Sequence, residues 1–169
     1  MKKIIFAFVL LFAAGISQAQ VAKYTYKPFN KEGCRVEFFV TSNNGKLHLV
    51  IDVKSDEGLA FSQEPVCQLR FGNGETLKIE GTNLGFARTS SETVVYSNYA
   101  SNTTSSYGRA VFLISEEEAE NFKSGIVKIR LTTVPFVHER TFDPYGLKGS
   151  IGEDIYKAYL KEKNKEENF

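Results

Sequence analysis

Apolar and polar residues alternate along much of this chain, which is the pattern of strands that bury one face. Residues 34–53 (CRVEFFVTSNNGKLHLVIDV) form two alternating runs joined by Asn-Asn-Gly. Asn-Gly between two such runs is the strongest short-range hairpin signal, because both residues tolerate positive φ. Residues 67–79 repeat the pattern around Gly72-Asn73-Gly74, so we expect a second hairpin there.

The second half of the chain predicts further strands separated by a polar segment. Residues 97–106 (SNYASNTTSS) are too polar to contribute to a core, and we predict that they form a loop. Apolar alternation returns afterwards, and strands are expected at residues 107–114, 127–131 and 138–142.

Two helices are predicted from capping signals. Ser115 with Glu118, and later Ser150 with Glu153, have the S-x-x-E spacing of a capping box. The first helix should end at Gly125. The second carries apolar residues at helical spacing, namely Ile151, Ile155, Tyr159 and Leu160. Residues 161–169 (KEKNKEENF) continue no apolar stripe, and we predict a charged, frayed tail.

These elements predict a mainly β fold of about eight strands with two short helices. Hairpin connections favour antiparallel pairing, so we predict an antiparallel β-sandwich. The alternative is an α+β arrangement, in which the two helices cover a single antiparallel sheet. The sequence pattern does not show how many sheets the strands form.

Residues 1–19 have the features of a secretory signal peptide that is cleaved before Gln20. Lys2 and Lys3 precede an apolar run (IIFAFVLLFAA), and small residues precede the cleavage point. The run is shorter than the roughly 20 apolar residues that a spanning helix needs. Since Cys34 is the first cysteine, no lipid anchor is expected near the cleavage point. We therefore expect an exported, soluble protein, periplasmic or secreted, with no stable membrane anchor.

The expected mature chain forms one domain with a balanced charge. We place this domain at residues 20–160, a length that can bury one core. The full chain has 21 basic and 20 acidic residues, and loss of Lys2 and Lys3 leaves 19 against 20. Proteins that bind nucleic acid usually carry a clear basic excess, so nucleic acid is not an expected partner.

Cys34 and Cys67 are the two cysteines of the chain, and each lies at the start of a predicted hairpin. Export would expose them to an oxidising compartment, in which neighbouring thiols form disulfides. We therefore predict a Cys34–Cys67 disulfide, and two separate buried thiols are the alternative. There is no C-x-x-C pattern that would indicate redox chemistry.

The two histidines of the chain, with their acidic neighbours, lead to one hypothesis of catalysis. His48 should lie on the solvated face of its strand, together with Val50 and Asp52. The other histidine, His138, and its neighbours Glu139 and Asp143 are the acid and base candidates if the protein is an enzyme. No metal-binding spacing and no cofactor motif is present, so neither a metal nor a cofactor is expected.

Tyrosines around the predicted polar loop offer a hypothesis of binding. Tyr96, Tyr99 and Tyr107 flank or lie within a segment rich in Ser, Thr and Asn. This mixture is typical of adaptable binding surfaces, although the same residues also suit a solvated connection.

The sequence therefore favours a non-catalytic binding module over an enzyme. The expected partner is an unidentified protein, peptide or glycan, and the chain is expected to be a monomer or a weak oligomer. The alternative is a periplasmic or secreted hydrolase whose site is assembled only in three dimensions.

Overall fold

The computed structural model describes residues 20–26, 34–43, 46–56, 58–85, 88–95, 100–143 and 150–167. The predicted signal peptide, the tip of the first hairpin, Tyr96 and Tyr99 lie outside these ranges. The described elements are β1 (Gln20–Tyr26), β2 (Cys34–Asn43), β3 (Lys46–Ser55), β4 (Ala60–Phe61), β5 (Val66–Phe71), β6 (Thr76–Asn83), β7 (Arg88–Val95), β8 (Ala100–Ile114), α2 (Glu116–Ala119), η2 (Glu120–Ser124), β9 (Ile126–Leu131), β10 (Thr133–Val134), β11 (His138–Thr141) and α3 (Ile151–Glu167).

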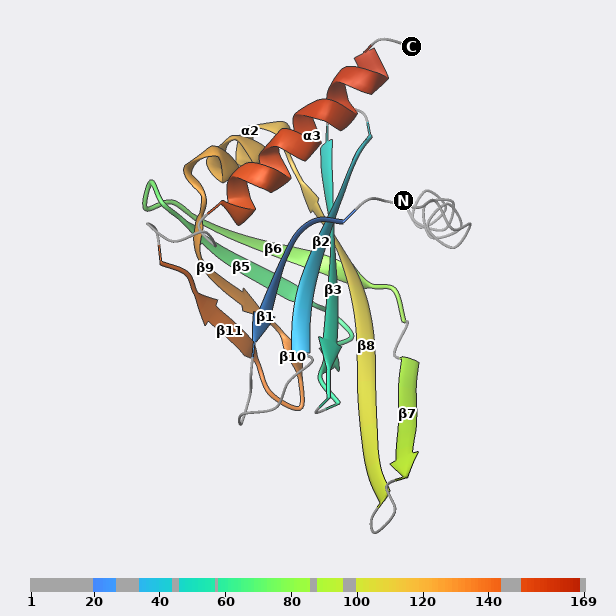
Figure 1. The fold of residues 1–169 in the computed structure, drawn as a ribbon. Coiled ribbons are helices and arrows are strands. Elements are labelled where there is room, and N and C mark those ends of the chain that lie inside the picture. The colour runs from blue at the N-terminus through green and yellow to red at the C-terminus, as the bar shows by residue number, and fades with distance from the viewer. Residues whose placement is uncertain are drawn as a thin grey trace.

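Nine strands form one antiparallel sheet that curls into a half-barrel (Figure 1). The order across it is β1-β2-β3-β8-β6-β5-β9-β11, and β7 pairs with β8 beside this path. Strands β4 and β10 form a separate two-stranded pair. The mainly β prediction is confirmed, whereas the sandwich prediction is wrong, because the strands form a single curled sheet.

The long strands explain why one sheet forms instead of two. Strand β3 pairs with β2 along one edge and with β8 along the other, and β8 passes on to pair with β6. The ladder of hydrogen bonds therefore continues without a break from the first hairpin to the second. Twist and curl allow such a sheet to enclose a core by itself.

The core fills the inside of the curled sheet, and helix α3 covers one end of it (Figure 1). Alternating residues of the strands point inward, for example Val36, Phe38, Leu49, Ile51 and Phe112, and all are buried. Helix α3 packs against β1, β2 and η2, and it buries Ile151, Ile155 and Tyr159 among these residues.

Two glycines allow α3 to approach the sheet closely. A Cβ atom on Gly152 would lie 2.8 Å from the Cα of Gly125, which is closer than real contacts allow. Gly125 itself has a φ of 74°, a conformation that favours glycine, and it ends η2 as predicted.

Both predicted helices form, and the second is longer than predicted. The Ser115–Glu118 capping box is present at the start of α2. Helix α3 begins after Ser150 but continues to Glu167, so the prediction of a frayed tail from residue 161 is wrong over this range. Ion pairs from Lys163 to Glu116 and from Lys165 to Glu162 hold this last part of the helix.

A buried cluster of one histidine and two tyrosines joins the two edges of the half-barrel. Strands β1 and β11 are the outermost strands in the sheet order. The Tyr24 hydroxyl of β1 shares a hydrogen bond of 2.8 Å with Nε2 of His138 on β11. The His138 ring also lies 4.4 Å from the ring of Tyr26, centroid to centroid. We call Tyr24, Tyr26 and His138 the edge cluster.

Burial keeps His138 neutral in the folded protein. The side chain is only 6% exposed. Burial is the main cause that lowers the pKa of His138 from 6.5 to about 4, and the nearby positive charge of Arg140 adds to the effect. The same burial raises the pKa of the Tyr24 hydroxyl well above its usual value. The edge cluster is therefore uncharged near neutral pH.

The edge cluster predicts a specific loss of stability in acid. As the pH falls below about 6.5, the unfolded chain binds a proton at His138 and the folded chain does not until about pH 4. The contribution of His138 to the free energy of unfolding should therefore fall by about 3 kcal/mol between these pH values and change no further below them. Urea unfolding at a series of pH values measures this change. His138→Gln can still hydrogen-bond but does not titrate, so an equal loss in that variant would contradict the prediction.

The predicted Cys34–Cys67 disulfide is wrong, since both cysteines are free and buried. Strands β2 and β5, which carry them, are separated in the sheet by β3, β8 and β6. Cys34 instead accepts a hydrogen bond of 3.4 Å from the backbone N–H of Asp56. Burial raises the pKa of the Cys67 thiol, which keeps it protonated and unreactive.

We expect both thiols to stay reduced when the folded protein is incubated with oxidised glutathione. Neither side chain is accessible, and the thiolate of Cys67 is strongly disfavoured. The check is maleimide labelling after denaturation without a reducing agent, followed by mass measurement. Two labels are expected, and a product without labels would contradict the assignment of free cysteines.

Candidate functional site

The three predicted acid and base residues do not form one site. His138 points into the core and belongs to the edge cluster. Glu139, the next residue on β11, points outward and forms an ion pair of 2.7 Å with Lys128. Asp143 is exposed beyond the end of the strand. Because neighbouring strand residues face opposite sides of a sheet, His138 and Glu139 do not act on the same substrate atom.

The predicted polar loop is mostly a strand. Residues 100–106 belong to β8 and pair with β7 to form a two-stranded arm that extends from the sheet (Figure 1). The loop prediction is therefore wrong for these residues, because backbone pairing along a hairpin does not need apolar side chains. Tyr96 and Tyr99 lie outside the described residues, so their predicted role in binding stays a prediction.

Tyr107, the third predicted tyrosine, belongs to a polar network at the base of this arm. Its hydroxyl donates a hydrogen bond to the carboxylate of Asp52. Arg109 holds the same carboxylate with two hydrogen bonds of 2.6 and 2.7 Å, and its guanidinium lies 5.5 Å from the ring centre of Phe39. Burial and the Asp52 carboxylate raise the pKa of Tyr107. The tyrosine hydroxyl is thus already engaged within the protein.

This network also corrects the expectation that the outer face of β3 is solvated. Asp52 is only 2% exposed, Val50 is 1% exposed and His48 is half-buried. Residues of the neighbouring strands cover the face, with Arg109 opposite Asp52 in the register. A buried carboxylate is stable when it is paired and hydrogen-bonded, as here. The network therefore stabilises this part of the sheet.

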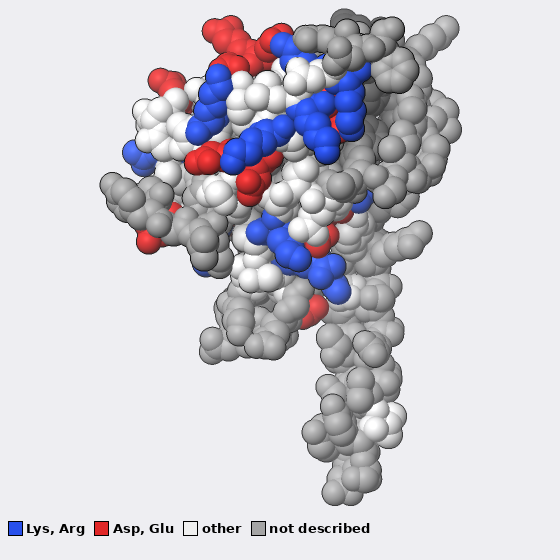
Figure 2. Space-filling model, turned by 45° about the horizontal axis from the view of Figure 1, so that its top comes forward, with Lys and Arg blue, Asp and Glu red and all other residues white. Residues whose placement is uncertain are grey.

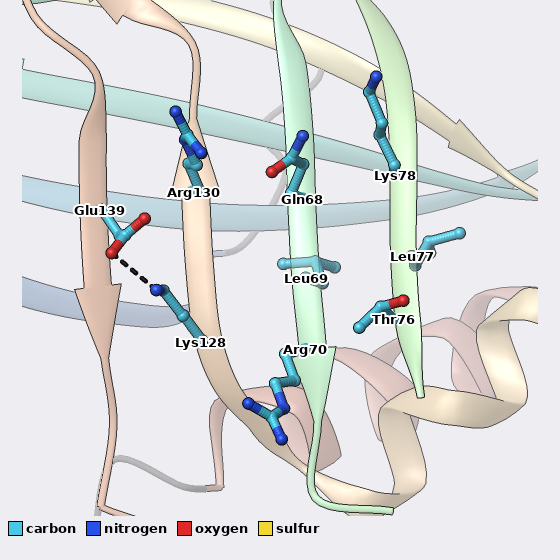
Figure 3. Close-up of a pocket in the computed structure, with 9 residues that line it drawn as sticks. All are labelled: Gln68, Leu69, Arg70, Thr76, Leu77, Lys78, Lys128, Arg130 and Glu139. Atoms are coloured by element: carbon cyan, nitrogen blue, oxygen red, sulfur yellow. Dashed lines mark ion pairs between the residues drawn. The ribbon is translucent and has the colours of Figure 1, made fainter. Parts of the chain in front are cut away.

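The candidate site is an open groove of about 370 Å³ on the outer face of β6, β5, β9 and β11. Figure 3 shows these four strands side by side with the lining side chains. The residues that line the groove are Gln68, Leu69, Arg70, Thr76, Leu77, Lys78, Lys128, Arg130 and Glu139. Leu69 and Leu77 are buried in the core, so the polar residues form the accessible surface. We call this surface the basic groove.

The strand register arranges the polar residues of the basic groove in two rows. Across the strands, Lys78 lies opposite Gln68, Gln68 opposite Arg130, and Arg130 opposite Glu139. In the second row Arg70 lies between Thr76 and Lys128. Neighbouring strands are about 4.8 Å apart, and alternate residues along a strand about 6.7 Å. The groove therefore presents positive charges that are roughly 5 to 10 Å apart.

The charges of the basic groove are only partly compensated. Glu139 binds Lys128, which holds the pKa of this carboxylate below its usual value. No ion pair joins Arg70, Lys78 or Arg130 to a carboxylate of the described residues. Arg70 also lies directly opposite Lys128. Like charges in that position destabilise a sheet, so this arrangement has a cost in folding that an anionic ligand would remove.

The face that carries α3 is also rich in charge, and several of its charges are paired. Figure 2 shows basic and acidic side chains side by side over that end of the molecule. Ion pairs there join Lys157 to Glu153 and Lys163 to Glu116. The basic groove differs, since four cations and one carboxylate line it in a chain with a net charge of only +1. The remainder of the chain is therefore net acidic, and the positive potential is concentrated at the groove.

The sequence pattern shows the cations of this site on each strand, but not which strands lie side by side. Lys128 and Arg130 alternate with apolar residues on one strand, and Arg70 and Lys78 do so on two others. Each strand alone reads as an ordinary solvated face. Only the pairing of β5 with β9 brings the three strands together, and these two strands are separated by more than fifty residues in the chain.

The described residues contain no cluster of three or more His, Cys, Asp or Glu side chains that would hold a metal ion. Of the helices that the structure describes, none has the length and apolar character of a membrane span. In comparisons with protein-family models, curated proteins and solved structures, none matched this chain. The geometry and charge of the basic groove are therefore the features of this chain that bear on its function.

Proposed function

We propose that this protein is an exported, non-catalytic binding module that holds an extended anionic ligand in the basic groove. The observation that carries the proposal is the set of three cations, Arg70, Lys78 and Arg130, none of which forms an ion pair with a carboxylate of the described residues. Glu139 lies opposite Arg130 in the register but forms its ion pair with Lys128. A ligand with anionic groups spaced by roughly 5 to 10 Å would meet them in register. Gln68 and Thr76 add hydrogen-bonding groups that neutral parts of the ligand can use.

The lining of the groove argues for a charged polymer and against nucleic acid. Among the residues that the structure describes, no aromatic side chain lines the groove, so bases have no surface there on which to stack. Sugar rings lack that surface as well, and recognition of a glycan would depend on its carboxylate, sulfate or phosphate groups. The groove crosses four strands, so an extended polymeric ligand can lie across them.

Removal of the three unpaired cations tests this proposal. The variant Arg70→Gln/Lys78→Gln/Arg130→Gln should bind fluorescently labelled polyglutamate about tenfold more weakly at low salt, because it loses three favourable charge contacts. Fluorescence anisotropy measures the affinity at several salt concentrations. The variant should unfold at a temperature no lower than the original protein, since it loses the like-charge pair Arg70–Lys128.

A matched control separates the groove from the net charge. The variant Lys157→Gln/Lys161→Gln/Lys165→Gln removes the same number of positive charges from exposed positions on α3. Its affinity for polyglutamate should change by less than about twofold at moderate salt, because it leaves the groove intact. Equal weakening by both variants would mean that polyglutamate responds only to net charge, and the basic groove would then have no specific role.

Export predicts a defined N-terminus. Strand β1 begins at Gln20, immediately after the proposed cleavage point, so cleavage would leave the strand complete. We expect mass spectrometry of the protein from the extracytoplasmic fraction of its host to give a chain that starts at Gln20. An intact chain that starts at Met1 and stays in the cytoplasm would contradict this part of the proposal.

A further inference from the structure

The turn between β10 and β11 exposes four consecutive apolar residues. Val134 is 50% exposed, Phe136 is 38% exposed and Val137 is 42% exposed, and Pro135 between them is exposed as well. Single exposed apolar residues are ordinary, but a run of four is unfavourable in water and contributes nothing to the core. Such a run indicates a surface that contacts something apolar. We call residues 134–137 the apolar turn.

Hydrogen bonds hold the apolar turn in a fixed shape. Thr133 Oγ1 donates to the carbonyl oxygen of Phe136 at 2.6 Å and accepts from the backbone N–H of His138 at 3.0 Å. The preceding Thr132 accepts a bond of 2.6 Å from the N–H of Val66 through its own hydroxyl. Because the turn is already ordered, little conformational entropy is lost when its side chains become buried in a contact.

The apolar turn borders the basic groove. Glu139, which lines the groove, is the second residue after Val137, and Arg130 lies opposite Glu139 on β9. The distance along the strand from Val137 to Glu139 is therefore about 7 Å. Figure 1 places this turn at the end of the sheet that lies away from α3. One region of the surface thus presents apolar side chains and positive charges next to each other.

We propose that this region binds the surface of an anionic phospholipid membrane. The side chains of the apolar turn enter the boundary between headgroups and acyl chains, and the cations of the basic groove contact lipid phosphates. The inference rests on the proposed function for its charged half, because the lipid headgroups are then the anions of the groove. Apolar insertion combined with a basic surface is the pattern of reversible membrane association, in which neither part suffices alone.

A lipid surface fits these observations better than a protein partner. The apolar residues stand on a convex turn, and a fluid lipid interface accepts such a protrusion without a matching pocket. The cations face outward from the open outer face of the sheet, so several headgroups can approach them at once, in agreement with charge complementarity. A protein partner would need both a fitted apolar pocket and an acidic patch at the same spacing.

A single tryptophan reports on insertion. The chain contains no Trp, so Phe136→Trp introduces a unique fluorophore in the apolar turn. Its emission should shift to the blue when vesicles of phosphatidylglycerol and phosphatidylcholine are added, and brominated lipids should quench it. The protein should bind vesicles of phosphatidylcholine alone about tenfold more weakly. Leu160→Trp is the matched control, because Leu160 is 37% exposed and lies on α3, and its emission should not change.

A second variant separates this inference from the proposed function. Val134→Ser/Phe136→Ser/Val137→Ser should bind the anionic vesicles about tenfold more weakly and should bind polyglutamate with unchanged affinity. All proteins are purified as their host processes them, with identical N-termini verified by mass spectrometry, so residues 1–19 do not differ between samples.

Four results would overturn the inference. Unchanged vesicle binding of the serine variant, or no blue shift of Trp at position 136, would remove the membrane contact while polyglutamate binding could still support the groove. A blue shift that arises with a purified host protein and not with vesicles would assign the turn to a protein partner. Conversely, vesicle binding that survives loss of the three groove cations would show that the groove does not supply the charged half.

Discussion

Contact between the two edges of the curled sheet is the constraint on which the other features depend. An antiparallel half-barrel leaves its first and last strands with unpaired backbone groups, and open edges invite unwanted pairing. Here side chains join the edges, since Tyr24 of β1 meets His138 of β11 inside the core. The contact places a titratable ring where only its neutral form is favourable. It also fixes β11, and therefore one wall of the basic groove and the end of the apolar turn.

In the second half of the sheet, one register places both the core residues and the cations of the basic groove. On β5 and β9 the inward residues, such as Leu69 and Ile129, complete the core, and the residues between them carry the charges of the basic groove. A shift of one residue would exchange these two sets. The register that buries the core therefore also places the cations opposite one another, including the unfavourable pair Arg70 and Lys128.

Local features of the fold were accessible from the sequence, whereas features set by distant strands were not. The hairpin around Gly74 and the capping box at Ser115 depend on a few neighbouring residues, and both are present. The number of sheets, the separation of Cys34 from Cys67 and the burial of Asp52 depend on the strand order. Alternation shows which residues share a face of a strand, but not which strand lies beside it. The basic groove could not be predicted for this reason, although each of its strands was.

The sheet order also determines when the fold can be completed. The hydrogen bond that joins the edges links residues 114 positions apart, one on the first described strand and one on the last. Contacts of such high sequence separation form slowly, because the intervening chain must first be brought into place. As the chain is synthesised from its N-terminus, the half-barrel stays open until β11 has been made. Helix α3 comes later still, and it supplies Ile155 and Tyr159 to the same core. A chain with this topology therefore completes its fold only after most of it has been synthesised.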